Sequence, residues 1–259
     1  MLMKTRIILV ACAIVSASVS AAAQGGADAL PFTRMETSPV LAGTAGAAVT
    51  ALQGAWGAFR GAATGAFETE TVSAAAQYTN FGGHSAFAAA AGVGVGGNIF
   101  LSAGVTGSDG ENGGGYQTGN ALAAFGAGVR LGESLSVGAN LRFASQYLTA
   151  DAKYSGASAD VSLLYKVSET ISAAAGVCTL GSSVKSSSGD AYAQPAYAFA
   201  GWTGTVGLGD IVIDVHFAAD YYFSGEYAAA AGAVLTYAGN CYLFLRRLKK
   251  KGARRLPDS

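Results

Sequence analysis

The chain has few charged residues: Asp, Glu, Lys and Arg make up 12% of its 259 residues, about half the level that is usual in soluble domains. It has two histidines, His84 and His216, and neither has a partner at metal-ligand spacing. The G-x-S-x-G sequence of serine hydrolases is absent. These absences argue against an enzyme, and neither a cofactor nor a metal is expected. A pair made by Ser162 or Asp160 with His216 is the remaining enzymatic alternative.

Cysteine and long apolar runs are scarce as well. Of three cysteines, Cys178 and Cys241 lie in the body of the sequence, so a disulfide scaffold is excluded, and one disulfide or two unpaired thiols remain as alternatives. Beyond residue 23, no 18-residue stretch is both strongly apolar and free of glycine and polar residues. A helical membrane protein is therefore excluded.

The sequence begins with what reads as an export signal. Lys4 and Arg6 flank the start of an apolar run over residues 7–15, and small residues before position 24 predict cleavage after Ala23. The alternative is a lipoprotein signal ending at Cys12, because "LVAC" resembles a lipobox. In either case the chain leaves the cytoplasm, so no nucleic-acid partner is expected.

The rest of the chain is apolar and rich in glycine. Hydrophobic residues make up 51% of the sequence, and 37 residues are glycine. An exported chain of this kind without membrane helices predicts an all-β fold, a transmembrane antiparallel β-barrel. We expect it in the outer membrane of a Gram-negative bacterium, surrounded by outer-membrane lipid.

The hydrophobic period supports strands. From Leu135 to Tyr147, apolar residues occupy the odd positions and small or polar residues the even ones, with Ser145 as the exception. In a barrel, this period of two turns one face of a strand to lipid and the other to the lumen. Eleven segments are predicted as strands, near residues 70–80, 84–94, 98–107, 119–131, 134–148, 157–167, 170–180, 195–206, 211–223, 226–237 and 240–246.

The connections between these segments differ in length. Tight joints fall at 95–98, 131–134, 167–170, 208–210 and 238–240, whereas the joints at 107–119, 149–156 and 181–194 are long and polar. The other two alternate joints, near Gly82 and Gly225, are short, so short and long joints mostly alternate. Short periplasmic turns and longer extracellular loops are typical of outer-membrane barrels. With the N-terminus in the periplasm, every tight joint falls on the periplasmic side.

Polar residues at the inward positions of the predicted strands are candidates for lining the lumen. Three of them share one face of a single strand, where a metal site or an acid–base site is the alternative to a plain polar lining. The candidates are Asn140, Arg142, Gln146, Asp160, Asp214, His216 and Asp220.

Residues 24–68, between the predicted signal and a barrel over residues 69–245, form a region of a different kind. From residue 30 onward the sequence does not alternate, and it is too interrupted by glycine for a long helix. Its apolar residues favour a hatch or plug inside the barrel over the alternative, a solvated periplasmic linker. The candidate plug residues are Leu41, Val49, Leu52, Trp56 and Phe59.

Two stretches resemble a known family. "ALPFTRMETSPVLAGTAGAAVTA" (29–51) is similar to the start of the PorV/PorQ family, a branch of the FadL-like outer-membrane barrels, and "YKVSETISAAAGVCTLGSSVK" (165–185) resembles one of its strand–turn–strand units. The chain departs from the family at "GAATGA" (61–66), where members carry an "NPAGLA"-like box. The resemblance implies a barrel of about 14 strands with an N-terminal hatch, of which about 11 strands are present here.

The resemblance also implies a choice of functions. Some relatives are accessory components of the type IX secretion system, with secretion-system proteins and secreted cargo as partners. Others are channels for hydrophobic small molecules and bind a hydrophobic ligand, and a structural or adhesive surface barrel is a third reading. The inward positions are mostly small or polar, with Phe100, Leu122 and Leu164 as exceptions, which favours the secretion accessory over an apolar channel.

The end of the chain has a different charge. Residues 24–245 carry 15 acidic and seven basic side chains, whereas residues 246–259 carry seven basic ones. Eleven is an odd number of strands, whereas single-chain bacterial barrels normally have an even number, and an open sheet leaves bare edges in lipid. We therefore predict that residues 246–259 are a basic tail produced by a frameshift or a gene-prediction error, with about three strands lost.

Overall fold

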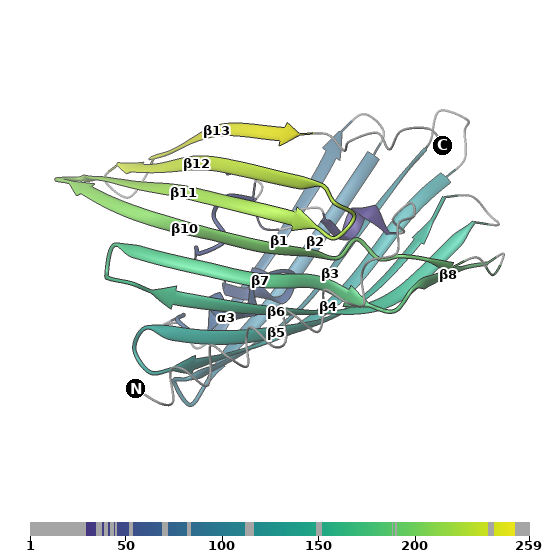
Figure 1. Cartoon of the computed structure of the whole chain (residues 1–259), viewed down its shortest axis with the longest axis horizontal. Helices are drawn as coiled ribbons and strands as arrows, with labels where there is room; N and C mark the ends of the chain where they lie inside the picture. The colour runs from purple at the N-terminus through teal and green to yellow at the C-terminus, as the bar shows by residue number, and fades with distance from the viewer. Residues whose placement is uncertain are drawn as a thin grey trace.

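The computed structural model is an all-β protein built on one large antiparallel sheet (Figure 1). It confirms the strand-rich fold class predicted from the sequence. The predicted export signal and the candidate plug residue Leu52 lie outside the described part of the chain. The structure describes residues 30–34, 38, 41, 44, 46–51, 54–68, 72–81, 84–111, 117–148, 152–187, 189, 191–237 and 241–251.

Three short helical elements come before the strands: η1 (Pro31–Arg34), η2 (Gly54–Ala58) and α3 (Ala62–Gly65). The strands are β1 (Val72–Phe81), β2 (His84–Val95), β3 (Ile99–Glu111), β4 (Gln117–Leu131), β5 (Leu135–Tyr147), β6 (Lys153–Lys166), β7 (Ile171–Gly181), β8 (Val184–Ser186), β9 (Ala191–Tyr192), β10 (Tyr197–Leu208), β11 (Ile211–Tyr222), β12 (Tyr227–Tyr237) and β13 (Cys241–Lys251).

The sheet follows the order of the chain. Its path runs β1-β2-β3-β4-β5-β6-β7-β10-β11-β12-β13, and the short strands β8 and β9 lie off this path, with β8 paired to β6 and to β9. Among the described residues, β1 and β13 are the two edges of the path and do not pair with each other.

Alternating burial along the strands confirms the predicted period of two. In β5, the even residues from Ser136 to Ala144 are all buried, whereas Ala139, Leu141 and Phe143 are exposed. Because successive side chains of a strand point to opposite faces, one face of the sheet is covered and the other is not. We call the covered side the inner face and the opposite side the outer face.

The connections predicted to be tight gather at one end of the sheet, although two further short connections, β1–β2 and β11–β12, lie at the other end. Three of the connections predicted to be tight use glycines with positive φ, such as Gly132 (φ 83°) and Gly209 (φ 63°), a conformation that glycine adopts without steric cost. We call this end the turn end, and the opposite end, where β3, β5 and the short strand β8 are followed by longer connections, the loop end.

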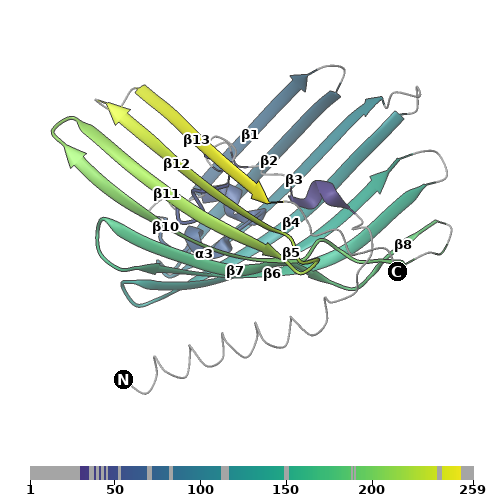
Figure 2. The ribbon, with the colours of Figure 1, turned by 45° about the horizontal axis from the view of Figure 1, so that its top comes forward.

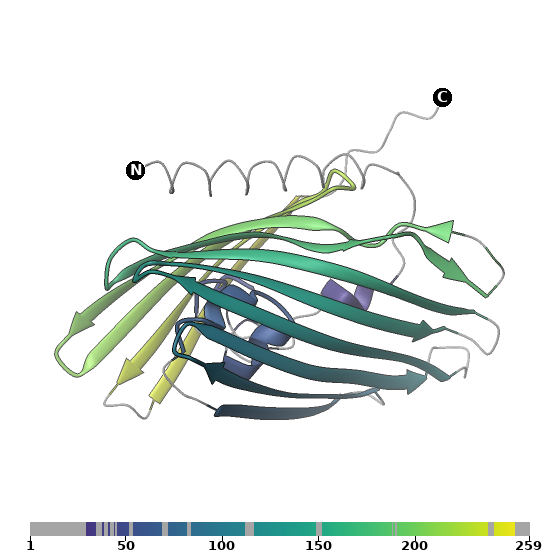
Figure 3. The ribbon, with the colours of Figure 1, turned by 90° about the horizontal axis from the view of Figure 1, so that it is seen from below.

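The sheet curves around the helical elements that precede it. Figures 2 and 3 show η2 and α3 inside the curve, toward the turn end, and η1 closer to β8 and the loop end. We call the described residues within 30–68 the inner segment. Its buried side chains, including Leu41, Val49 and Phe59, pack into two clusters with residues of the inner face, such as Leu164 and Leu122.

The structure corrects several predicted boundaries. The predicted loop at 181–194 contains β8 and β9, and β3 and β4 extend into the predicted loop at 107–119. β6 begins at Lys153, four residues before its predicted start, and β13 ends at Lys251, five residues after its predicted end. Polar and glycine-rich strand ends carry no hydrophobic period, so the sequence pattern did not mark them.

Within the described residues, none of the helices is both long and apolar enough to cross a membrane.

Candidate functional site

The centre of the inner face is a seat of glycines on which α3 rests. A methyl group on Gly128 would overlap the carbonyl oxygen of Ala62, and one on Gly138 would overlap the backbone nitrogen of Ala63. The backbone of α3 therefore lies directly against β4 and β5. Only residues without a side chain permit this distance, which explains why glycine occupies these inward positions.

Asn140 clamps the backbone just ahead of α3. Its Nδ2 donates to the carbonyl oxygens of Gly57 (2.7 Å) and Ala58 (2.8 Å), and its Oδ1 accepts from the backbone N–H of Ala62 (3.3 Å). The side chain is completely buried. These bonds satisfy backbone groups that so short a helix leaves without partners of its own.

Two serines hold the same turn from neighbouring strands. Ser136 Oγ on β5 donates to the carbonyl oxygen of Ala63 (2.7 Å), and Ser162 Oγ on β6 accepts from its backbone N–H (3.2 Å). Both hydroxyls contact backbone rather than side-chain atoms. We call the inner faces of β4, β5 and β6 the β4–β6 wall: its hydrogen bonds to this turn go to backbone atoms, while its apolar residues, such as Leu122 and Leu164, pack against side chains of the inner segment.

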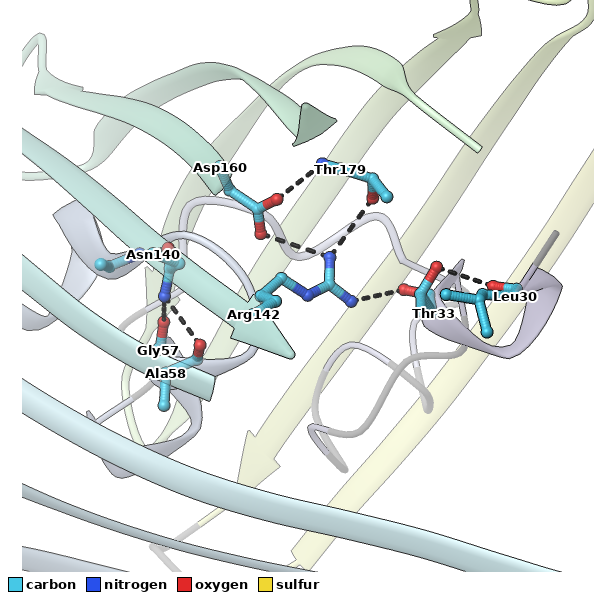
Figure 4. Close-up of polar contacts among 9 residues, drawn as sticks. Leu30, Thr33, Gly57, Ala58, Asn140, Arg142, Asp160 and Thr179 are labelled. Atoms are coloured by element: carbon cyan, nitrogen blue, oxygen red, sulfur yellow. Dashed lines mark hydrogen bonds and ion pairs between the residues drawn. The ribbon is translucent and has the colours of Figure 1, made fainter. Parts of the chain in front are cut away.

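Arg142 on β5 connects the β4–β6 wall to η1, the part of the inner segment nearest the loop end (Figure 4). Its Nη2 donates to the carbonyl oxygen of Thr33 (2.6 Å), while its Nη1 lies 3.3 Å from Asp160 Oδ2 and 3.4 Å from Thr179 Oγ1. Arg142 and Asp160 are both buried. The ion pair neutralises two charges in the interior, and one side of the guanidinium remains available to η1.

Two residues near the Arg142 guanidinium in space have a strained backbone. Thr179 (φ 59°) and Leu30 (φ 56°) are the two non-glycine residues with positive φ among the described residues. Thr179 lies where the register between β6 and β7 shifts, and its N–H donates to Asp160 Oδ1 (2.6 Å). The Leu30 carbonyl accepts from the N–H and the hydroxyl of Thr33. Both conformations are rare for residues with a side chain. Asp160 bonds directly to Thr179, whereas Leu30 is bonded to Thr33, whose own carbonyl accepts from Arg142.

The inner faces of β10 and β11, which we call the β10–β11 wall, contact side chains of the inner segment. Arg60 Nη2 lies 3.1 Å from Asp220 Oδ1, and its guanidinium lies 5.4 Å and 4.8 Å from the ring centres of Tyr197 and Phe199. A second contact is a hydrogen bond between the hydroxyls of Thr50 and Thr203.

His216 belongs to the β10–β11 wall and not to an acid–base pair with Ser162 or Asp160. Its Nδ1 lies 2.6 Å from Thr203 Oγ1, and Asp214 accepts a hydrogen bond from Thr205 (2.5 Å). Ser162 is bonded to the backbone of Ala63, and Asp160 to Arg142. No group of three or more His, Cys, Asp or Glu side chains that could hold a metal ion occurs within the described residues.

The sequence-predicted residues are distributed as follows. Of the candidate lumen residues, Asn140, Arg142, Asp160 and His216 are buried on the inner face, and Gln146, Asp214 and Asp220 are partly buried. Of the candidate plug residues, Leu41, Val49 and Phe59 are buried, and Trp56 is partly buried with its ring centre 6.0 Å from that of Phe59. Cys178 is a buried free thiol on β7, whereas the side chain of Cys241 is outside the described set.

Sequence reasoning missed a second set of residues at the site. A signal was available for some of them: the glycines occur at inward positions of strands whose outward positions are large and apolar, and Arg60 is a single cation in a nearly uncharged stretch. Ser162 was named only as a possible partner of His216, and nothing in the sequence singled out the other hydroxyl residues. The missed residues are Thr33, Arg60, Gly128, Ser136, Gly138 and Thr179.

A hollow of about 480 Å³ lies at the turn end, away from these contacts. It is lined by Glu133, Glu169 and Lys166 together with several hydroxyl side chains, and Lys166 Nζ lies 4.2 Å from the ring centre of Phe67 in the inner segment. The hollow is open to solvent, so it offers little enclosure for an apolar ligand.

No protein-family model matches the chain, and no curated protein matches it either.

Proposed function

We propose that this protein is an outer-membrane β-barrel of the PorV/PorQ type, whose inner segment is a plug and which assists type IX secretion or cargo attachment at the cell surface. The observation that carries the proposal is the outer face. Large apolar side chains are exposed along it from β1 to β12, among them Leu141 (57%), Phe143 (52%) and Trp202 (45%). Soluble proteins rarely expose contiguous apolar surface on this scale, whereas lipid-facing strands require it.

Closure of the sheet is part of this proposal. In hydrocarbon, each unpaired backbone group of an edge strand costs several kcal/mol, so the edges at β1 and β13 must be paired or covered in a membrane. The strong curvature of the sheet around the inner segment supports a closed form (Figure 2). The turn end then faces the periplasm and the loop end faces the outside of the cell.

The filled interior favours an accessory role over transport. The large apolar side chains that point inward are already used in packing: Phe100 contacts Gly65 and Gly92, and Leu122 and Leu164 belong to the two buried clusters. A channel for hydrophobic molecules needs such side chains free to line a tunnel. We therefore place function on the loop end, where secretion-system proteins or secreted cargo would bind.

Two experiments test the proposal in order. The protein folded into liposomes should migrate differently on a gel before and after heating, and its strands should resist protease. Secreted cargo should then be retained by the folded, immobilised barrel and not by the heat-denatured one. Uptake of a labelled fatty acid into the liposomes without cargo retention would favour the channel instead. A chain that stays soluble and monomeric without detergent would contradict the membrane location itself.

A further inference from the structure

The short strands β8 and β9 form a hairpin outside the main path of the sheet, at its loop end (Figure 1). We call it the β8–β9 hairpin. Backbone pairing attaches it only weakly: β8 makes two residue pairs with β6 and two with β9, whereas β5 and β6 share thirteen. Elements with so little pairing open at lower free energy than the sheet that carries them.

Side chains hold this hairpin against the beginning of the inner segment, near Leu30. Val184 on β8 is completely buried, in the same cluster as Leu30 and Leu122. A methyl group on Gly156 would lie 2.8 Å from Val184 Cγ2, so this glycine allows the hairpin to lie close against β6. The rings of Tyr154 and Tyr192 meet edge to face, 5.7 Å between centres.

One side chain holds the base of the hairpin. Gln194 Nε2 donates to the carbonyl oxygens of Ala157 (2.8 Å) and Ser182 (2.9 Å). A methyl group on Gly181 would overlap this amide, so the glycine makes room for it. Ser187, just after β8, adds two hydrogen bonds to the backbone of Lys153 on β6: its N–H donates to the Lys153 carbonyl (3.1 Å), and its Oγ accepts from the Lys153 N–H (3.4 Å). These contacts join the hairpin mainly to β6, along one side.

The inner segment beneath it is fastened far more firmly. Asn140, Ser136 and Ser162 bind its backbone, and Arg142 binds the Thr33 carbonyl next to the strained Leu30. If one of the two elements moves alone, it is the hairpin. We propose that the β8–β9 hairpin is a lid over the loop end of the interior, which opens while the inner segment stays in place.

The proposal predicts an order of accessibility for three single cysteines, placed in a chain whose native cysteines are replaced by alanine. Ser183→Cys is at an exposed position, Val184→Cys lies on the buried side of the lid itself, and Ala124→Cys is buried in the same cluster on β4. A membrane-impermeant maleimide added to the folded protein should label the first at once. It should label the second more slowly, yet about tenfold or more faster than the third.

Each outcome decides the matter. Equal rates for Val184→Cys and Ala124→Cys would show that the hairpin does not open alone, and equal rates for Val184→Cys and Ser183→Cys would show that it does not close. Either result overturns the lid. Heat-modifiable migration on a gel confirms that each variant is folded, and Val184→Cys is small enough to be accommodated in the cluster.

A second variant sharpens the test. Gln194→Ala removes both bonds at the base, so it should raise the labelling rate at Val184→Cys severalfold and leave Ala124→Cys unchanged. Ser183→Ala, at an exposed neighbouring position, is the matched control and should change neither rate. The inference relies on the proposed function only in taking the loop end as an accessible mouth. The assay uses neither cargo nor fatty acid, so its failure would leave the secretion role untouched.

Discussion

The two walls that hold the inner segment do so by different chemistry. The β4–β6 wall binds backbone atoms of the segment through Asn140, Ser136 and Ser162, and its glycines let α3 rest on the sheet. The β10–β11 wall binds side chains of the segment, through Arg60 and Thr50. A wall that binds backbone fixes where the chain runs, whereas a wall that binds side chains adds affinity that single substitutions remove.

The largest effect is expected at Arg142, where the β4–β6 wall meets η1. Arg142→Met leaves Asp160 buried without its cation and the Thr33 carbonyl without its donor, and it should lower the free energy of unfolding by about 3–5 kcal/mol. The measurement is a urea titration in detergent micelles of a Trp202→Phe chain, in which Trp56 of the inner segment is the remaining tryptophan. Adding Asp160→Leu should restore part of the loss; a double variant weaker than the single one would contradict this account.

A somewhat smaller effect is expected where the backbones touch. Gly138→Val pushes against the backbone of α3, which has no flexible side chain to yield, so the free energy of unfolding should fall by about 3 kcal/mol. Gly207→Val on β10 is the matched control, because open space surrounds that position. The two variants are compared in the same urea titration. Similar stabilities would show that α3 is not seated on β5 as described.

The smallest effect is expected on the other wall. Arg60→Met removes the ion pair with Asp220 and the contacts with two aromatic rings, and should cost about 1 kcal/mol. The expected loss is small because the Asp220 side chain is 22% exposed, and solvent weakens the ion pair. Lys153→Met, at an exposed position on β6, should leave the urea midpoint unchanged. A loss at Arg60 as large as that at Arg142 would remove the difference between the walls.

The sequence contained most of the fold and only part of the site. All eleven strands of the main path were predicted, several of them from the period of two, which in a sheet with one covered face is a direct consequence of geometry. This period missed β8 and β9, since strands of three and two residues are too short to show a period. It stopped short at the ends of β3, β4 and β6, because polar and glycine-rich strand ends carry no hydrophobic period.

The site depends on contacts between residues far apart in the chain, which a single sequence does not display. Asn140 and Arg142 were identified as inward and polar, yet their partners at Gly57, Ala58 and Thr33 follow only from the folded course of the inner segment. The strained backbone at Thr179 was invisible as well, because a threonine in a strand predicts ordinary extended geometry.

The contact between α3 and the glycines of β4 and β5 has a consequence for hydration of the interior. Where Gly128 and Gly138 face Ala62 and Ala63, no space remains for even one added methyl group. A water molecule needs more room than that, so water cannot enter between α3 and the two strands that it touches. The contact is made by backbone atoms on both sides, so the exclusion of water does not depend on any side chain holding a particular rotamer.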